Sequence, residues 1–140
     1  MFCQYLPSTQ PDNIMTVPVL KCITRAQREK DGFQSFKAWI EHDNHEYIGP
    51  NLHKYVKNYN GKESMWVNPY LYHFPNAEAN KLFENFIRSQ AVLYNCIPSL
   101  TDKVLGCWCE PLTSSNGEVS ECHGDVLIKL YNEYHLYTIL

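Results

Sequence analysis

Apolar residues crowd three short stretches of this chain, and each stretch predicts a β-strand. The first covers residues 15–23 and is rich in β-branched side chains. Pro18 lacks an amide hydrogen, so we expect this strand to begin at Pro18 or to lie at a sheet edge. The second is the short segment 46–50, which ends in Gly-Pro. The third, residues 104–108, is apolar at nearly every position, which predicts a central strand covered on both faces.

Apolar side chains at helical spacing predict two main helices. We expect the first over residues 76–94, with Asn76 as its N-cap, and the second from Cys122 or His123 onward. The residues predicted to line the inner face are Ala79, Leu82, Phe83, Phe86, Ile87 and Gln90 in the first helix, and Val126, Leu127, Leu130, Tyr131 and Tyr134 in the second. Aromatic residues spaced by three also favour a helical face within residues 24–40.

The order strand, strand, helix, strand, helix predicts the α/β class. We expect a small single-domain sandwich with an at least partly parallel sheet and two main helices. A chain of 140 residues suits one such domain and is too short for two ordinary ones. The expected organisation is an irregular N-terminal arm over residues 1–13 and a single α/β domain over residues 14–140.

Charge and hydropathy argue against several classes of function. The formal net charge is −3, whereas general nucleic-acid binding normally requires a basic surface. No apolar run reaches the roughly 18 residues that a membrane span needs. The first residues do not resemble a secretory signal, so we expect reduced cysteines and a cytoplasmic location, in a cytosol or in a virion assembled there.

Half of the six cysteines lie within residues 107–122, beside a histidine. Cys107, Cys109, Cys122 and His123 offer the ligand types and the ligand number that a structural zinc site uses. Two features count against zinc. A Cys-x-Cys pair in a strand places its Cα atoms about 7 Å apart on one face, and adjacent Cys and His residues rarely reach the same ion.

The same residues admit a catalytic and a structural interpretation. Cys122 at a helix N-terminus could act as a nucleophilic thiol with the help of His123, and Asp125 could orient that histidine. Alternatively, the thiols are small apolar groups that pack beneath Trp108, which is common for buried cysteine. The sequence favours this packing interpretation and leaves the other two open.

A ligand pocket could be built around the same turn. Gly124 would let a ligand approach the backbone closely, and Asp125 could bind a ribose hydroxyl or simply complement the helix dipole. Asn68 could form a second wall of this pocket by hydrogen bonding to an amide or hydroxyl group of the ligand, with Trp66 or Tyr70 stacking on a base. The alternative for this second segment is a turn that is anchored by a buried tryptophan.

Four short motifs occur in one order along the chain: Tyr47-Ile48-Gly49, Trp66-Val67-Asn68-Pro69-Tyr70, Cys107-Trp108-Cys109-Glu110-Pro111 and Cys122-His123-Gly124-Asp125. Together they resemble the domain-of-unknown-function 4326 family of phages, bacteria and viruses, over about residues 46–133. Family members usually carry a basic residue where this chain has Pro50. They also join the last two motifs by only a couple of residues, where this chain inserts residues 112–121. The resemblance implies no established activity.

We therefore expect a phage-like or viral protein that binds or processes a small polar ligand. The leading candidate for this ligand is a nucleotide or nucleoside derivative. The expected pocket comprises Asn68, Trp108, Cys109, Cys122, His123 and Asp125, and its ligand-binding residues would be Asn68, Trp66, Tyr70, Trp108 and Gly124. The alternative is an interaction or virion-associated module with a protein partner or a second copy of the chain. In that case the Cys/His motif is structural, and zinc is the cofactor that it would suit.

Overall fold

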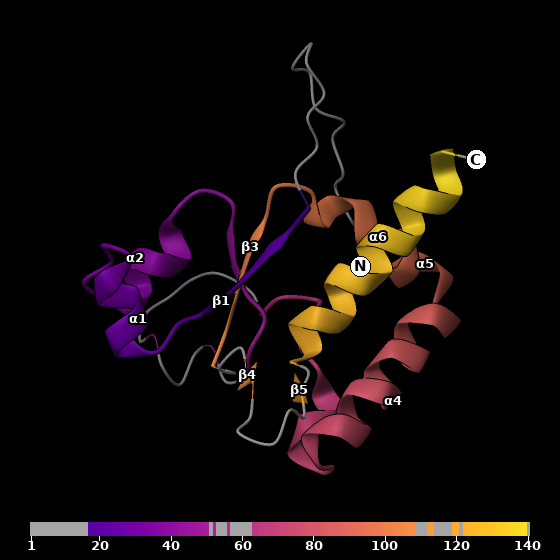
Figure 1. Cartoon of the computed structure of the whole chain (residues 1–140), viewed down its shortest axis with the longest axis horizontal. Coiled ribbons are helices and arrows are strands. Elements are labelled where there is room, and N and C mark those ends of the chain that lie inside the picture. Colours follow the sequence, from indigo (N-terminus) through magenta and orange to yellow (C-terminus); the bar gives the residue numbers. More distant parts are fainter. Residues whose placement is uncertain are drawn as a thin grey trace.

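A three-stranded parallel sheet forms the centre of the molecule (Figure 1). The computed structural model describes residues 17–50, 52, 56, 63–108, 112–113, 119–120 and 122–139. The strands are β1 (Val19–Cys22), β2 (His45–Tyr47) and β3 (Val104–Cys107), and β3 lies between the other two. Leu105 of β3 is in register with Leu20 of β1 and with Glu46 of β2. The predicted α/β class, the parallel pairing and the central position of the third strand are confirmed.

Helices cover both faces of the sheet. Figure 1 shows α1 (Arg25–Lys30) and α2 (Phe36–Glu41) on one side of it. The other side carries α4 (Asn76–Ser89), α5 (Ala91–Tyr94) and α6 (His123–Ile139), with two short 3₁₀ helices, η1 (Pro69–Tyr72) and η2 (Ile97–Leu100). None of the helices in the described part of the chain is long and apolar enough to cross a membrane.

The order of the strands explains why the helices form two layers. The chain passes from β1 across the position of β3 to β2, and then returns from β2 to β3. These two crossovers run in opposite directions along the sheet. Crossovers of one hand that run in opposite directions must place their helices on opposite faces, and parallel crossovers are nearly always right-handed. The α1–α2 pair and α4 accordingly lie on different faces.

The helix boundaries differ from the predicted ones for local reasons. Residues 24–40 form two helices, because Gly32 between them adopts a φ of 95°, which belongs to no right-handed helix. The predicted 76–94 helix is also divided, since Gln90 is extended between α4 and α5. Asn76 is the first residue of α4 and Pro75 is its N-cap, so the predicted capping role of Asn76 is wrong.

Successive residues of β3 serve the two layers alternately. Leu105 and Cys107 belong to the core beneath α4, α5 and α6. Val104 and Trp108 pack against the other core, which is largely aromatic and is centred on α2. Gly106 faces that second core as well, because a Cβ at this position would lie only 2.3 Å from the Trp39 ring. The strand is thus buried on both faces, as its apolar composition predicts.

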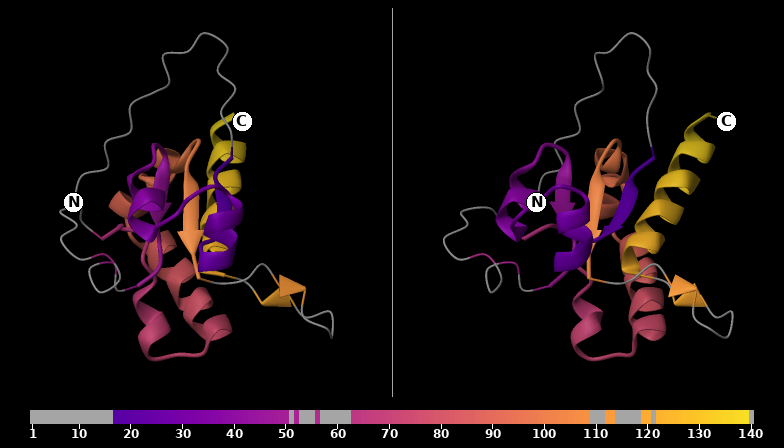
Figure 2. Two further views of the ribbon diagram at one scale, coloured as in Figure 1. Left: turned by 90° about the vertical axis from the view of Figure 1, so that its left-hand side faces the viewer. Right: turned by 60° about the vertical axis from the view of Figure 1, so that its left-hand side comes forward.

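A small antiparallel pair, β4 (Leu112–Thr113) with β5 (Val119–Ser120), forms within the inserted segment 112–121. Both views in Figure 2 show this pair projecting beyond the rest of the domain, near the end of β3 and the start of α6. The β4–β5 pair therefore lies outside the two helical layers. The predicted N-terminal arm, residues 1–13, lies outside the described residues.

Replacing Leu105 with Ala is expected to lower the free energy of unfolding by about 2–5 kcal/mol, because its side chain is fully buried and the truncation leaves a cavity. Urea denaturation of the two proteins measures this difference. Leu136→Ala is the matched control, since Leu136 is 60% exposed and its truncation should change stability by less than about 0.5 kcal/mol. Equal losses in both variants would contradict the burial of Leu105.

Candidate functional site

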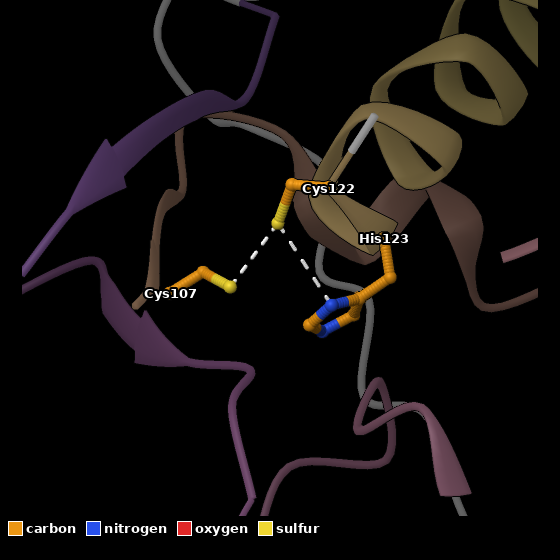
Figure 3. Close-up of side chains that lie close together, drawn as sticks. All are labelled: Cys107, Cys122 and His123. Atoms are coloured by element: carbon orange, nitrogen blue, oxygen red, sulfur yellow. Dashed lines mark hydrogen bonds between the residues drawn. The ribbon is translucent and has the colours of Figure 1, made fainter. Parts of the chain in front are cut away.

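Two thiols and an imidazole converge where β3 ends and α6 begins (Figure 3). The Sγ atoms of Cys107 and Cys122 are 3.1 Å apart, and Cys122 Sγ lies 3.9 Å from His123 Nδ1. One ligand atom from each of the three residues lies within 4.8 Å of the other two, and all three residues are buried. We call Cys107, Cys122 and His123 the Cys–His cluster.

A backbone carbonyl fixes the tautomer of His123. Its Nε2 lies 2.7 Å from the carbonyl oxygen of Ile48, the residue that follows β2. Because a carbonyl oxygen can only accept, Nε2 must carry the hydrogen, and a neutral imidazole then keeps its lone pair on Nδ1. This Nδ1 is the atom that faces Cys122 in Figure 3. The imidazole thus presents a ligand atom to the thiols and holds the start of α6 against the end of β2.

The first turn of α6 is capped by its own side chains. The backbone N–H of Cys122 donates to Asp125 Oδ2 at 3.0 Å, and the N–H of Gly124 donates to Cys122 Sγ at 3.4 Å. This reciprocal arrangement satisfies two amides near the helix start in the manner of a capping box. Asp125 therefore binds the backbone of this turn. In the described interactions its carboxylate bonds to Cys122 and not to His123.

Gly124 and Trp108 do not line a common pocket with the Cys–His cluster. A Cβ at Gly124 would come within 2.4 Å of a Leu20 methyl, so this glycine allows α6 to approach β1. Trp108 stacks on Phe36 with ring centroids 5.4 Å apart, and its Nε1–H donates to Tyr47 Oη at 2.7 Å. These contacts belong to the α2 side of the sheet, whereas Cys107 and Cys122 belong to the α6 side. Cys107 and Cys122 are buried, as the packing interpretation predicts, but they lie on the opposite side of the sheet from Trp108, because adjacent strand residues point to opposite faces.

Asn68 is buried completely and serves the fold around α4. Its side-chain oxygen accepts from the N–H of Tyr70 at 3.0 Å, and its Nδ2 donates to the Ala79 carbonyl and to Asn80 Oδ1 at 3.2 and 3.3 Å. Trp66 is 1% exposed in the same core, and Tyr70 packs on that core half-buried. The Trp-x-Asn-Pro-Tyr motif thus forms a turn anchored by a buried tryptophan, as the structural alternative anticipated.

Sequence reasoning missed two partners in this region. Ile48 contributes only its backbone carbonyl to His123, and nothing in a side-chain pattern marks such an acceptor. Asn80 could have been found, because it is a polar residue on the otherwise apolar face of α4, between Ala79 and Phe83. The predicted pocket and metal residue Cys109 lies outside the described residues.

A surface cavity of about 320 Å³ lies between α4 and α6. Its polar lining comprises Asn80, Lys81, Glu84, Asn85 and Lys129. Burial raises the pKa of Glu84, but hydrogen bonds and charges from Lys129 and Arg88 outweigh this effect and hold the pKa below its usual value. Glu84 therefore stays ionised at neutral pH, and the lining carries two cations against one anion.

His123→Ala is expected to lower the free energy of unfolding by about 1–3 kcal/mol in the presence of a chelator, because it leaves the Ile48 carbonyl buried without its donor. Chemical denaturation measures the change. His42→Ala is the control, since His42 is an exposed histidine of the loop before β2. His123 is 1% exposed, whereas a general acid or base must reach a proton of the substrate. A His123→Ala protein as stable as the wild type would contradict the structural role.

Comparison with known proteins places this chain in a family. The family model described as a domain of unknown function, DUF4326, matches residues 33–133. An uncharacterized protein of Acanthamoeba polyphaga mimivirus, R718, is 32% identical over 120 residues, which cover 84% of this chain and 82% of the viral protein. No solved structure matches the chain. The residues that form the Cys–His cluster and the Asn68 turn lie within the matched region, and the chain belongs to the domain-of-unknown-function 4326 family.

Proposed function

We propose that this domain binds a zinc ion through the Cys–His cluster and that the ion holds the domain together as an interaction or virion-associated module. The observation that carries the proposal is the convergence of two thiols and an imidazole nitrogen within 4.8 Å in a buried site. Thiolate and imidazole are the ligands that structural zinc prefers. Such a module would keep its thiols in a reducing compartment such as a host cytosol, or in a virion assembled there.

The distances within the cluster fit this ion after small adjustments. Tetrahedral zinc, with bonds of about 2.3 Å to sulfur and 2.0–2.1 Å to nitrogen, places its ligand atoms about 3.6–3.8 Å apart. The two sulfurs are 3.1 Å apart and the sulfur–nitrogen distance is 3.9 Å, so rotations of the Cys107 and Cys122 side chains would suffice. The bond from His123 Nε2–H to the Ile48 carbonyl supplies the outer-sphere support that zinc-bound histidines usually have.

A fourth ligand would complete the tetrahedron. The sequence offers Cys109 for this role, two residues beyond Cys107. We propose Cys109 as that ligand, with a water molecule as the alternative that the experiment below separates. The ion would then connect the end of β3 with the start of α6 across the inserted segment, and through His123 with the end of β2.

The purified full chain is expected to contain about one zinc ion per molecule by elemental analysis, and its cobalt form should show thiolate-to-metal charge-transfer absorption. Cys107→Ser, Cys122→Ser and His123→Ala should each weaken zinc binding by more than about 100-fold, since even outer-sphere changes cost 10–100-fold. Cys96→Ala is the control, because Cys96 is buried in the same core outside the cluster. Absence of zinc from the wild type in zinc-supplemented buffer would refute the proposal.

Two further readouts belong to this experiment. A chelator should lower the thermal midpoint of the wild type and leave that of Cys122→Ser unchanged, because only the wild type gains stability from the ion. Cys109→Ser should alter the cobalt spectrum if Cys109 binds the metal, and an unchanged spectrum would assign the fourth position to water.

Binding of a small anionic ligand, such as a nucleotide or nucleoside phosphate, is the second candidate function. The cavity between α4 and α6 favours it, because Lys81 and Lys129 line that cavity and Asn80 is held in place there by Asn68. Asn68 would then act on the ligand through Asn80 rather than by contact. We propose binding and not turnover, since Cys122 and His123 are buried away from the cavity lining.

Millimolar adenosine monophosphate is expected to raise the thermal midpoint of the wild type, and Lys81→Ala should weaken this binding by about tenfold through the loss of one charge-assisted hydrogen bond. Lys37→Ala is the control, because Lys37 is an exposed lysine of α2 on the opposite side of the sheet. Inorganic phosphate and adenosine are tested in parallel to separate the phosphate contribution from that of the base. No midpoint shift with any of the three compounds would refute this candidate.

A further inference from the structure

The two sulfurs of the Cys–His cluster are close enough to react with each other. Cys107 and Cys122 are both thiols in this structure, with their Sγ atoms 3.1 Å apart. A disulfide bond is about 2.05 Å long, so the sulfurs need to approach by only about 1 Å to form one. The two residues are 15 positions apart along the chain, and the end of β3 and the start of α6 hold them together.

Metal binding and disulfide formation exclude each other at these two atoms. Zinc requires both sulfurs as negatively charged thiolates, whereas a disulfide leaves neither sulfur with a charge. A cluster built from one buried pair of thiols therefore has two covalent states, of which only the reduced state can hold the ion. This inference rests on the proposed zinc site.

We propose that a small peroxide oxidises the cluster to a Cys107–Cys122 disulfide and thereby releases the zinc ion, so that metal binding by this domain is under redox control. The class of oxidant follows from burial, because Cys107 is 3% exposed and Cys122 is 5% exposed. A molecule the size of hydrogen peroxide needs far less opening of the fold than a peptide disulfide does.

The reaction proceeds in two steps with a balanced exchange of electrons. The Cys122 thiolate, whose sulfur accepts the Gly124 N–H at the start of α6, attacks one peroxide oxygen; a sulfur–oxygen bond forms, the oxygen–oxygen bond breaks and hydroxide leaves. The Cys107 thiolate then attacks Cys122 Sγ, so the disulfide forms, the sulfur–oxygen bond breaks and a second hydroxide leaves. Two thiolates are oxidised by two electrons in total, one peroxide is reduced, and both hydroxides take protons from solvent.

Other cysteines provide internal controls for this specificity. Cys96 is buried in the same core, yet it is not one of the residues that converge at the cluster. Cys22 is half-buried, and its Sγ lies near Thr24 Oγ1 and the Trp108 carbonyl. A reaction governed by thiol exposure would favour Cys22, whereas a reaction governed by geometry favours the Cys107–Cys122 pair.

The test treats the zinc-loaded full chain with a small molar excess of hydrogen peroxide. A chromogenic chelator follows zinc release, and proteolysis without reductant followed by mass spectrometry identifies the linked cysteines. We expect zinc release and the Cys107–Cys122 peptide to appear in parallel, and dithiothreitol to restore zinc binding. Cys96→Ala should behave as the wild type, and Cys107→Ser should accumulate a dimedone-reactive sulfenic acid at Cys122.

Several outcomes would overturn the inference. One is a linkage of Cys122 to any other cysteine as the main product, and another is zinc release without loss of thiols. Retention of zinc at peroxide concentrations that fully oxidise Cys22 would do so as well. The disulfide can also be mapped on the metal-free chain. A protein that binds no zinc but forms the Cys107–Cys122 bond therefore refutes the proposed zinc site and the release of zinc, and leaves the disulfide standing. A zinc protein that never forms this bond refutes only the redox control.

Discussion

Two helical layers are held together by a strand of four residues, because β3 hydrogen-bonds to both neighbouring strands and buries both of its faces. Because both faces of β3 are covered, each of its residues faces one helical layer or the other. Leu105 and Cys107 go to the α4–α6 layer, while Val104 and Gly106 go to the α1–α2 layer. The same alternation continues at the end of the strand, where Cys107 and Trp108 lie on opposite sides of the sheet.

The position of the Cys–His cluster also follows from the parallel sheet. Parallel strands point their carboxyl ends to one edge, and α6 begins at this edge directly after Cys122. His123 then reaches back to the carbonyl that follows β2, so residues from three separate segments meet in one buried site. Such a site is shielded from solvent by the two-layer architecture itself. A buried location suits an ion that stabilises a fold better than it suits a reaction that exchanges substrate with water.

The sequence predicts the parts of this fold that rest on hydrophobic periodicity. The apolar run at β3 indicates a strand covered on both faces, and the stripe from Val126 to Tyr131 marks the inner face of α6. The separation of Cys107 and Trp108 also follows from the two-residue period of a strand, although the motif invites a reading of both residues as one pocket. The division of residues 24–40 is harder to predict, since it depends on the backbone conformation of Gly32.

The candidate site is less accessible to prediction, for a physical reason. Cysteine and histidine are recognisable as metal-ligand residue types, so these residues can be selected from the sequence alone. The partner that fixes the imidazole is a main-chain carbonyl, and every residue of the chain carries one. Only the three-dimensional path of the chain after β2 decides that the carbonyl of Ile48 fills this role.

The segment that contains the β4–β5 pair is a site where the domain can accept inserted residues. The two strands of the pair are antiparallel, so additional residues between β4 and β5 need not move the end of β3 or the start of α6. The entropy of loop closure grows only with the logarithm of loop length, which makes such additions thermodynamically mild. The pair projects beyond the two layers and is therefore a natural attachment point for a fluorophore, an affinity tag or a grafted peptide. A protein engineer could use it to label the domain while leaving its core sequence intact.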